Sequence, residues 1–185
     1  PMATCMGTNA ELGKLRVSSR ITTHFDGYCA VAMTFAPARQ TVALQSLSLD
    51  IPLNGELVTL VRDNKLSTLI GGKSGPIGNY WSQSLLKNPF FWVGNERIGL
   101  NWLAPDLEQW HCHDTGKNVE IVRQDDVAVV RLNLVDHPLE LRVPRTVRFG
   151  FALTPTRPLD RKILRKRLGK DWQGWCQPWK YFAVP

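Results

Sequence analysis

Polar and apolar residues alternate with a period of two along most of the chain between residues 14 and 153. Successive side chains of a β-strand point to opposite faces, so this alternation predicts strands with one buried and one solvated face. In the clearest stretch, residues 46–53, the phase that begins at Leu47 is leucine or isoleucine, and the phase that begins at Ser46 is mainly serine and aspartate. No stretch shows a convincing 3.6-residue period, so helices that connect parallel strands are not expected.

Turn signals divide the alternating region into short strands. Asp26-Gly27 separates residues 15–25 from 31–37, Gly94–Arg97 separates 90–93 from 98–103, and Gln124–Asp126 separates 119–123 from 127–135. Each pair predicts a β-hairpin. Further strands are expected at 57–62, after Asn54-Gly55, and at 147–153, and the Gly-rich residues 71–79 are expected to form a long loop. The pattern predicts an all-β fold, an antiparallel β-sandwich.

The alternation stops at Thr154, and Pro155 and Pro158 follow. We therefore expect a sandwich over residues 1–158 and a basic, aromatic-rich, irregular extension over 159–185. Five large aromatic residues at its end require an apolar surface to cover, on the sandwich or on a neighbouring domain: Trp172, Trp175, Trp179, Tyr181 and Phe182. Because the chain begins with Pro1, we expect it to be a segment of a longer protein.

The positive charge is concentrated in one short segment. The net charge is +7, and residues 161–170 hold six Lys or Arg and no acid. A single basic run is typical of a solvated linker, so we expect no nucleic-acid partner. No apolar run reaches the roughly 18–20 residues that span a bilayer, so no membrane partner is expected either.

The chain offers little chemistry. His111 and His113 would share one face of a strand and could converge on a metal ion, but no third ligand is evident nearby, so we expect no metal site. Carboxylates in residues 95–114 lack the apolar surroundings that make a general acid. Gly72-Lys73-Ser74 lacks the upstream spacing of a phosphate loop. We expect no catalytic residue and no cofactor.

Tryptophans of the middle region are the best candidates for a carbohydrate contact, since an indole ring can stack on the apolar face of a sugar. Trp92 and Trp102 lie in predicted strands and are expected in the core. Trp110 lies in a predicted loop, and we expect it to be at least partly exposed.

Residues 88–110 read NPFFWVGNERIGLNWLAPDLEQW. This block resembles one in bacterial proteins related to glycoside hydrolase family 123, and the resemblance extends to residues 47–53, 127–136 and 144–159. It implies an N-terminal β-sandwich that precedes a TIM-barrel catalytic domain. The family's catalytic carboxylates lie on that barrel, so none is carried over here. The implied partners are the downstream catalytic domain and, through it, a carbohydrate. The compartment stays open; an extracellular or periplasmic location is compatible with the longer protein.

The resemblance rests on nine matching residues: Trp92, Gly94, Asn95, Glu96, Arg97, Gly99, Leu100, Trp102 and Trp110. It departs from the family at residues 103–107, which read LAPDL where the family has an acidic stretch. Of the matching residues, four are expected to form a structural motif: Trp92, Gly94, Gly99 and Trp102. Four others are candidate contacts with the sugar rim or with the next domain: Asn95, Glu96, Arg97 and Trp110. The Arg97 guanidinium is also expected to bind a carboxylate or carbonyls beside the turn.

Three functions are compatible with these residues. The favoured one is a non-catalytic accessory sandwich that packs on a catalytic barrel. A second is a stand-alone carbohydrate-binding module that uses an exposed Trp110. The third and least favoured is a nucleic-acid-binding domain that uses residues 161–170.

Overall fold

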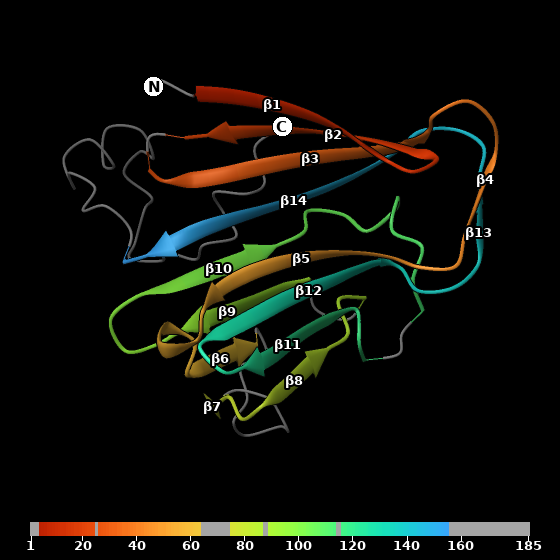
Figure 1. Ribbon diagram of the computed structural model, residues 1–185. Helices are drawn as coiled ribbons and strands as arrows, with labels where there is room; N and C mark the ends of the chain where they lie inside the picture. Colours follow the sequence, from red (N-terminus) through yellow and green to blue (C-terminus); the bar gives the residue numbers. More distant parts are fainter. Residues whose placement is uncertain (1–3, 25, 64–74, 87–88, 114–115, 156–185) are drawn as a thin grey trace, which may run out of the picture.

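The fold is described from a computed structural model, which covers residues 4–24, 26–63, 75–86, 89–113 and 116–155 (Figure 1). Within these ranges the chain forms strands and a single 3-10 turn, η1 (Gly55–Leu57). None of the described residues belongs to a helix with the length and hydropathy that a membrane span requires. The predicted extension, 159–185, and the predicted boundary at 158 lie outside the described residues.

The strands form two large sheets and one small one, with antiparallel pairing throughout. The prediction of an all-β antiparallel sandwich is confirmed.

The eight-stranded sheet has the order β1 (Thr4–Leu12), β2 (Leu15–Thr23), β3 (Tyr28–Pro37), β14 (Arg145–Thr154), β10 (Gly99–Leu103), β9 (Phe90–Gly94), β6 (Leu60–Asp63), β7 (Gly75–Pro76). The four-stranded sheet has the order β5 (Leu47–Asn54), β12 (Val127–Val135), β11 (Val119–Gln124), β8 (Tyr80–Gln83). The small sheet pairs β13 (Leu139–Leu141) with β4 (Val42–Leu44).

All three predicted hairpins are present, as β2–β3, β9–β10 and β11–β12. At the first turn, Gly27 has a φ of 88°, which glycine adopts without strain, and the Asp26 carboxylate accepts a hydrogen bond from the Tyr28 backbone N–H at 3.0 Å. Alternation together with a turn residue that suits its position was enough to predict these pairs.

Several segments differ from the sequence prediction, among them the short strands β4, β8 and β13, which were not predicted. Residues 4–12 form β1, a strand that was not predicted. The strand expected at 57–62 starts only at Leu60, because the Asn54 side chain accepts the Glu56 backbone N–H and caps the short turn η1. Of the predicted loop 71–79, residues 75–76 pair with β6, and residues 71–74 are not described.

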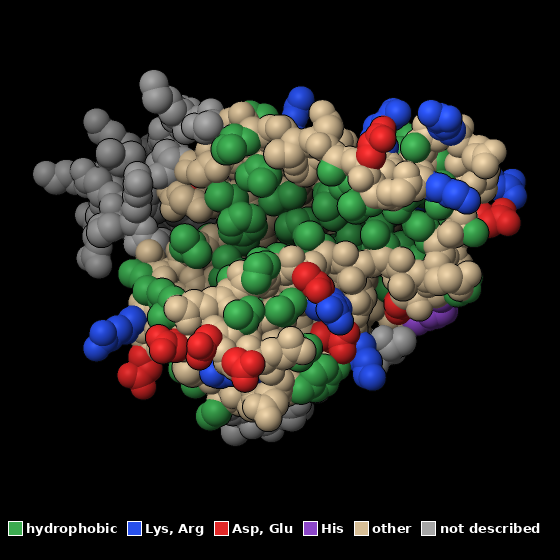
Figure 2. All heavy atoms as spheres, viewed as in Figure 1, with side chains coloured by type: hydrophobic (Ala, Val, Ile, Leu, Met, Phe, Trp, Pro, Cys, Tyr) green, Lys and Arg blue, Asp and Glu red, His purple; other side chains and the backbone are tan. Residues whose placement is uncertain are grey.

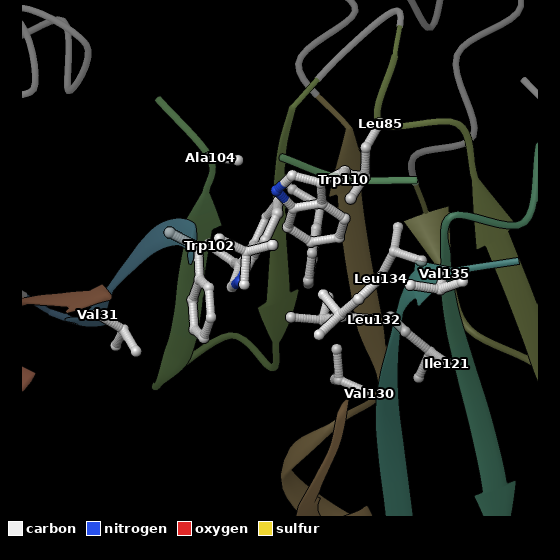
Figure 3. Packing of buried hydrophobic residues seen from close by; sticks show 14 of the residues in the cluster. Val31, Leu85, Trp102, Ala104, Trp110, Ile121, Val130, Leu132, Leu134 and Val135 are labelled. Carbon is white, nitrogen blue, oxygen red and sulfur yellow. The ribbon is translucent and has the colours of Figure 1, made fainter. Parts of the chain in front are cut away.

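An aromatic cluster fills the space between the two large sheets (Figure 3). Trp102 on β10 is fully buried and contacts three other rings. Its ring centroid lies 5.2 Å from that of Phe91 and 6.0 Å from that of Phe149, both stacked, and 6.1 Å from that of Trp110, edge-on at 83°. The opposite sheet closes the core with Ile121, Val130 and Leu132. Burying one such ring stabilises the fold by roughly 4–6 kcal/mol as an upper estimate from area.

The prediction that Trp110 is partly exposed is wrong, since only 6% of its surface is accessible. Its backbone N–H donates to the Leu107 carbonyl at 3.0 Å, which turns the loop inward. The next residue, His111, then donates its N–H to the Leu134 carbonyl at 2.9 Å, which fastens the loop to β12. These bonds aim the indole ring between the sheets.

The eight-stranded sheet is wider than the sheet that covers it, so part of its inner face is bare. The side chains of β2 that point inward are paired with side chains of β1 on the same face: Met6 is paired with Ile21, and Leu12 with Leu15. Met6 and Leu12 are 65% and 59% exposed. We call six apolar residues on this face the apolar overhang, of which the first three lie on β1 and the last three are partly buried: Met6, Ala10, Leu12, Val17, Ile21 and Met33.

The edge of the covering sheet is equally open. The inward side chains of β5 are only half-buried: Leu47, Leu49, Ile51 and Leu53. In Figure 2, hydrophobic side chains gather along the seam between β14 and β5. The sandwich is therefore closed at the Trp102 cluster and open along β5.

Replacing Trp110 tests its place in the core. Trp110→Ala should destabilise the domain by about 3–5 kcal/mol, because it leaves a cavity beside Trp102. Trp110→Phe should cost much less, since the Trp110 indole N–H has no hydrogen-bond acceptor among the described residues and its burial is itself unfavourable by about 1–3 kcal/mol. Urea denaturation followed by circular dichroism measures both. Similar losses for the two variants would contradict this assignment.

Candidate functional site

Three of the four predicted contact residues, Asn95, Glu96 and Arg97, lie in the β9–β10 turn. The Asn95 backbone N–H donates to the Ile98 carbonyl at 2.8 Å, which closes the hairpin. The Asn95 side-chain oxygen accepts the backbone N–H groups of Arg97 and Ile98 at 2.9 and 3.0 Å. An asparagine that bonds the backbone two and three residues ahead is a local turn device. The side chain of Asn95 is therefore committed to shaping the turn.

The Trp92 ring packs across the strand ends behind this turn. Gly94 and Gly99 are directly paired, and the ring lies against both. A Cβ added at Gly99 would come within 2.4 Å of the ring, and one added at Gly94 would come within 2.3 Å of the Ile98 carbonyl oxygen. The Trp92 indole N–H donates to the Thr154 hydroxyl at 3.0 Å. The prediction that Trp92 lies in the core is wrong, because Phe91 and Val93 take the inward phase of β9 and Trp92 lies half-buried on the opposite face. The two glycines leave the room that its indole occupies.

Arg97 does not make the contact that was expected of it. Its side chain is exposed and forms no hydrogen bond or ion pair with any described residue. The expectation that its guanidinium stabilises the turn is wrong, because the side-chain oxygen of Asn95 already holds the turn backbone. The Arg97 guanidinium is consequently available to an external partner.

Two shallow hollows lie at this end of the sandwich, where Figure 1 shows η1, the β9–β10 turn and the β11–β12 turn side by side. One has a volume of about 280 Å³ and is lined by Glu56, Thr59, Leu60, Asn95, Glu96 and Arg97. The other has a volume of about 460 Å³ and is lined by Pro52, Leu53, Asn54, Glu56, Asp126 and Val127. We call the first the turn hollow.

Backbone contacts hold the three turns together. The Gly55 N–H donates to the Asp126 carbonyl at 2.7 Å, and the Thr59 N–H donates to the Gly94 carbonyl at 2.9 Å. The Arg123 guanidinium donates to the Val58 carbonyl at 2.8 Å. The turn hollow is therefore a fixed surface with carboxylates and one guanidinium around it. Its side chains can form hydrogen bonds with a polar ligand. Its lining residues include no nucleophile that is hydrogen-bonded to a base, which is the arrangement that covalent catalysis requires.

The other predicted residues lie elsewhere. Trp102 and Trp110 belong to the buried cluster, so neither offers a ring face to a ligand. Cys112 is half-buried, and burial raises the pKa of its thiol to about 11. A thiol with this pKa stays protonated at neutral pH and is a poor nucleophile.

The third partner that was not evident beside His111 and His113 is present in the fold. Asp136 and His137 follow β12 directly and lie against the two histidines, although Asp136 is 23 residues from His113 in the sequence. Burial alone would raise the pKa of the Asp136 carboxyl, but hydrogen bonds from the His137 ring and the His113 N–H lower it. The available sequence signal was the adjacent Asp136 and His137, which follow directly after the predicted strand 127–135.

Comparisons with known proteins do not identify a family. No family model matches the chain, and no curated protein matches it. Among solved structures, the chain is similar to an Escherichia coli K12 protein described as a "putative aldose 1-epimerase", with 10% sequence identity and a TM-score of 0.47. The match covers 82% of this chain and 65% of that one, so this chain spans less than two thirds of the neighbour. A similarity at this level does not indicate what the chain binds.

Substitution of Gly94 tests the packing behind the turn. Gly94→Ala should destabilise the domain by about 1–3 kcal/mol or more, because the added methyl group meets backbone atoms that cannot rotate away. Gly7→Ala is the matched control, since it also lies in a strand and its added Cβ would be 3.7 Å from the nearest atom. We expect this control to be neutral or slightly stabilising. Urea denaturation measures both, and equal effects would refute the packing.

Proposed function

We propose that this chain is a non-catalytic accessory β-sandwich of a glycoside-hydrolase-like protein, and that its apolar overhang packs against the catalytic domain of the same polypeptide. The observation that carries the proposal is the bare inner face of β1, where Met6 and Leu12 are largely exposed. Large apolar side chains that gather on one surface are typical of an interface.

The pattern of β1 supports an interface on one face only. Its inward phase holds Met6, Ala10 and Leu12 with Thr8 between them, whereas its outward phase holds no large apolar residue and ends in the polar Asn9 and Glu11. In a strand that is exposed to water on both faces, polar residues are expected in both phases. The half-buried inward side chains of β5 add to this apolar surface, so the interface with a partner can be large.

The resemblance of residues 88–110 to glycoside hydrolase family 123 relatives supports the choice of partner. In those proteins a catalytic barrel follows the sandwich, and a domain that follows in the same chain is held close to the overhang. The turn hollow would then lie at the rim of a sugar site. Trp110, the predicted platform of a stand-alone carbohydrate-binding module, is buried, which removes the main support for that alternative.

Two lysine substitutions on β1 test the interface. In the 185-residue chain, Met6→Lys and Asn9→Lys should both change stability by no more than about 0.5 kcal/mol, because both side chains are exposed. In the full-length protein, Met6→Lys should lower the melting temperature by several degrees, since it buries an unpaired charge. Asn9→Lys adds the same charge on the outer face and should have no such effect. If Met6→Lys is equally harmless in both contexts, the catalytic domain does not cover this face.

The rim position of the turn hollow is tested by catalysis. In the full-length protein, Arg97→Ala and Glu96→Gln should raise KM for an oligosaccharide several-fold while leaving the melting temperature unchanged, because neither side chain supports the fold. Glu11→Gln, on the outer face of β1, is the control and should leave KM unchanged. Steady-state kinetics and thermal melts of the four proteins decide it. An unchanged KM in both hollow variants would remove the turn hollow from the sugar site.

A further inference from the structure

Three of the four histidines of the chain gather at one end of the sandwich. His111 and His113 come from the loop after β10, and His137 comes from the segment between β12 and β13. The His137 ring lies between the other two, with centroid distances of 3.8 Å to each. Asp136 lies beside them. We call these four residues the histidine cluster.

The Asp136 carboxylate lies between two imidazole nitrogens. Its Oδ1 atom is 2.6 Å from Nδ1 of His137 and 3.3 Å from Nδ1 of His113. His113, Asp136 and His137 each offer one ligand atom, and these atoms lie within 4.8 Å of one another. Tetrahedral zinc with bonds of about 2.0–2.1 Å places its ligand atoms roughly 3.3 Å apart. Small rotations of the three side chains reach that spacing.

The backbone holds the two segments in place without help from an ion. His111 forms a bridge with the end of β12, in which its N–H donates to the Leu134 carbonyl and its carbonyl accepts the Asp136 N–H at 3.0 Å. The His113 N–H donates to Oδ2 of Asp136 at 2.9 Å. The carboxylate is thus oriented by its own backbone and by that of the facing loop, so the ligand set is largely preorganised.

The cluster is accessible from solvent on one side. The His113 side chain is 64% exposed, whereas Asp136 is 17% exposed. The histidine side chains visible in Figure 2 gather at the edge of the molecule, on the side where Figure 1 shows β12 leading to β13. An ion can therefore reach the ligand atoms from the side of His113.

We propose that His113, Asp136 and His137 bind a divalent transition-metal cation of the zinc type, with His111 as a positioning residue that stacks on His137. Two imidazoles and a carboxylate are nitrogen and oxygen ligands that suit Zn²⁺ and its neighbours better than Ca²⁺ or Mg²⁺, which prefer oxygen alone. Three protein ligands leave one position for water or for a donor from another molecule. The inference is independent of the accessory role proposed above.

His111 contributes by orientation. Its Nε2 lies 3.4 Å from the Pro138 carbonyl, at hydrogen-bonding distance, and its ring packs on His137. Contacts behind the ligands typically change metal affinity about 10- to 100-fold. The competing interpretation is a purely structural contact, in which Asp136 and the histidines hold the loop on β12 and no cation binds.

The test is a Zn²⁺ titration of the untagged 185-residue chain after chelator treatment, measured by calorimetry in a Cys5→Ser, Cys176→Ser background, which removes the one exposed thiol of the described residues and the cysteine that lies outside them. We expect one saturable site with micromolar or tighter affinity and a rise in melting temperature with Zn²⁺ concentration. The Co²⁺ complex should show no thiolate charge-transfer band. Mg²⁺ should not compete.

Three variants separate coordination from folding. His113→Gln and His137→Gln should each weaken Zn²⁺ binding at least about 10-fold. His113→Gln keeps the backbone N–H that Asp136 accepts, and its exposed ring can be lost without unfolding the domain, so its melting temperature without zinc should be unchanged. His24→Ala, which removes the one histidine outside the cluster, should bind as the parent does. Absence of saturable binding up to about 100 µM Zn²⁺, or equal affinity in His113→Gln and the parent, would overturn the proposal and support the purely structural contact.

Discussion

The stacking of Trp102 on Phe91 and Phe149 joins three neighbouring strands, β9, β10 and β14, in the middle of the large sheet. Trp110 then meets the same indole edge-on from a loop that is bonded to the opposite sheet. One aromatic contact therefore links both layers. The order of the central strands, the path of the 104–113 loop and the position of the histidine cluster all depend on it.

The same core explains where the sandwich is incomplete. The four-stranded layer lies over the half of the eight-stranded sheet that holds β10, β9 and β6 (Figure 1), so buried apolar side chains are concentrated around Trp102 and become fewer toward β1. The inner face of β1 carries Met6, Ala10 and Leu12, interrupted by Thr8, and has no layer above it. An apolar face that is patterned for burial but left in water is the main reason to infer a partner domain.

Two polar surfaces lie at different ends of this frame and differ in kind. The turn hollow is lined by residues of η1, the start of β6 and the β9–β10 turn, and its charged side chains are exposed and are not paired with one another. The histidine cluster is built from two segments whose side chains face one another across a backbone bridge. The first suits a weak contact with a polar ligand, whereas the second has the converging donors that a cation requires.

The strands and hairpins could be predicted because their signals are local. Period-two alternation and turn residues such as Asp26-Gly27 determine the conformation of a few adjacent residues, and the structure confirms them. Residues 4–12 escaped prediction because their outward phase is broken by Cys5 and Gly7 and their inward phase by Thr8, which weakens the alternation. The Trp92, Gly94 and Gly99 block was visible as a motif, but the packing of the ring over the two glycines was not.

By itself the sequence determined the fold class, the hairpins and the concentration of basic charge after residue 160. Only the tertiary structure decided that Trp110 is buried, that the side chain of Asn95 and not Arg97 holds the turn, and that Asp136 and His137 meet His113. The physical reason is the range of the interactions. Alternation and turn preference act over a few residues, whereas burial and side-chain convergence depend on long-range pairing, here a bridge between residue 111 and the end of β12.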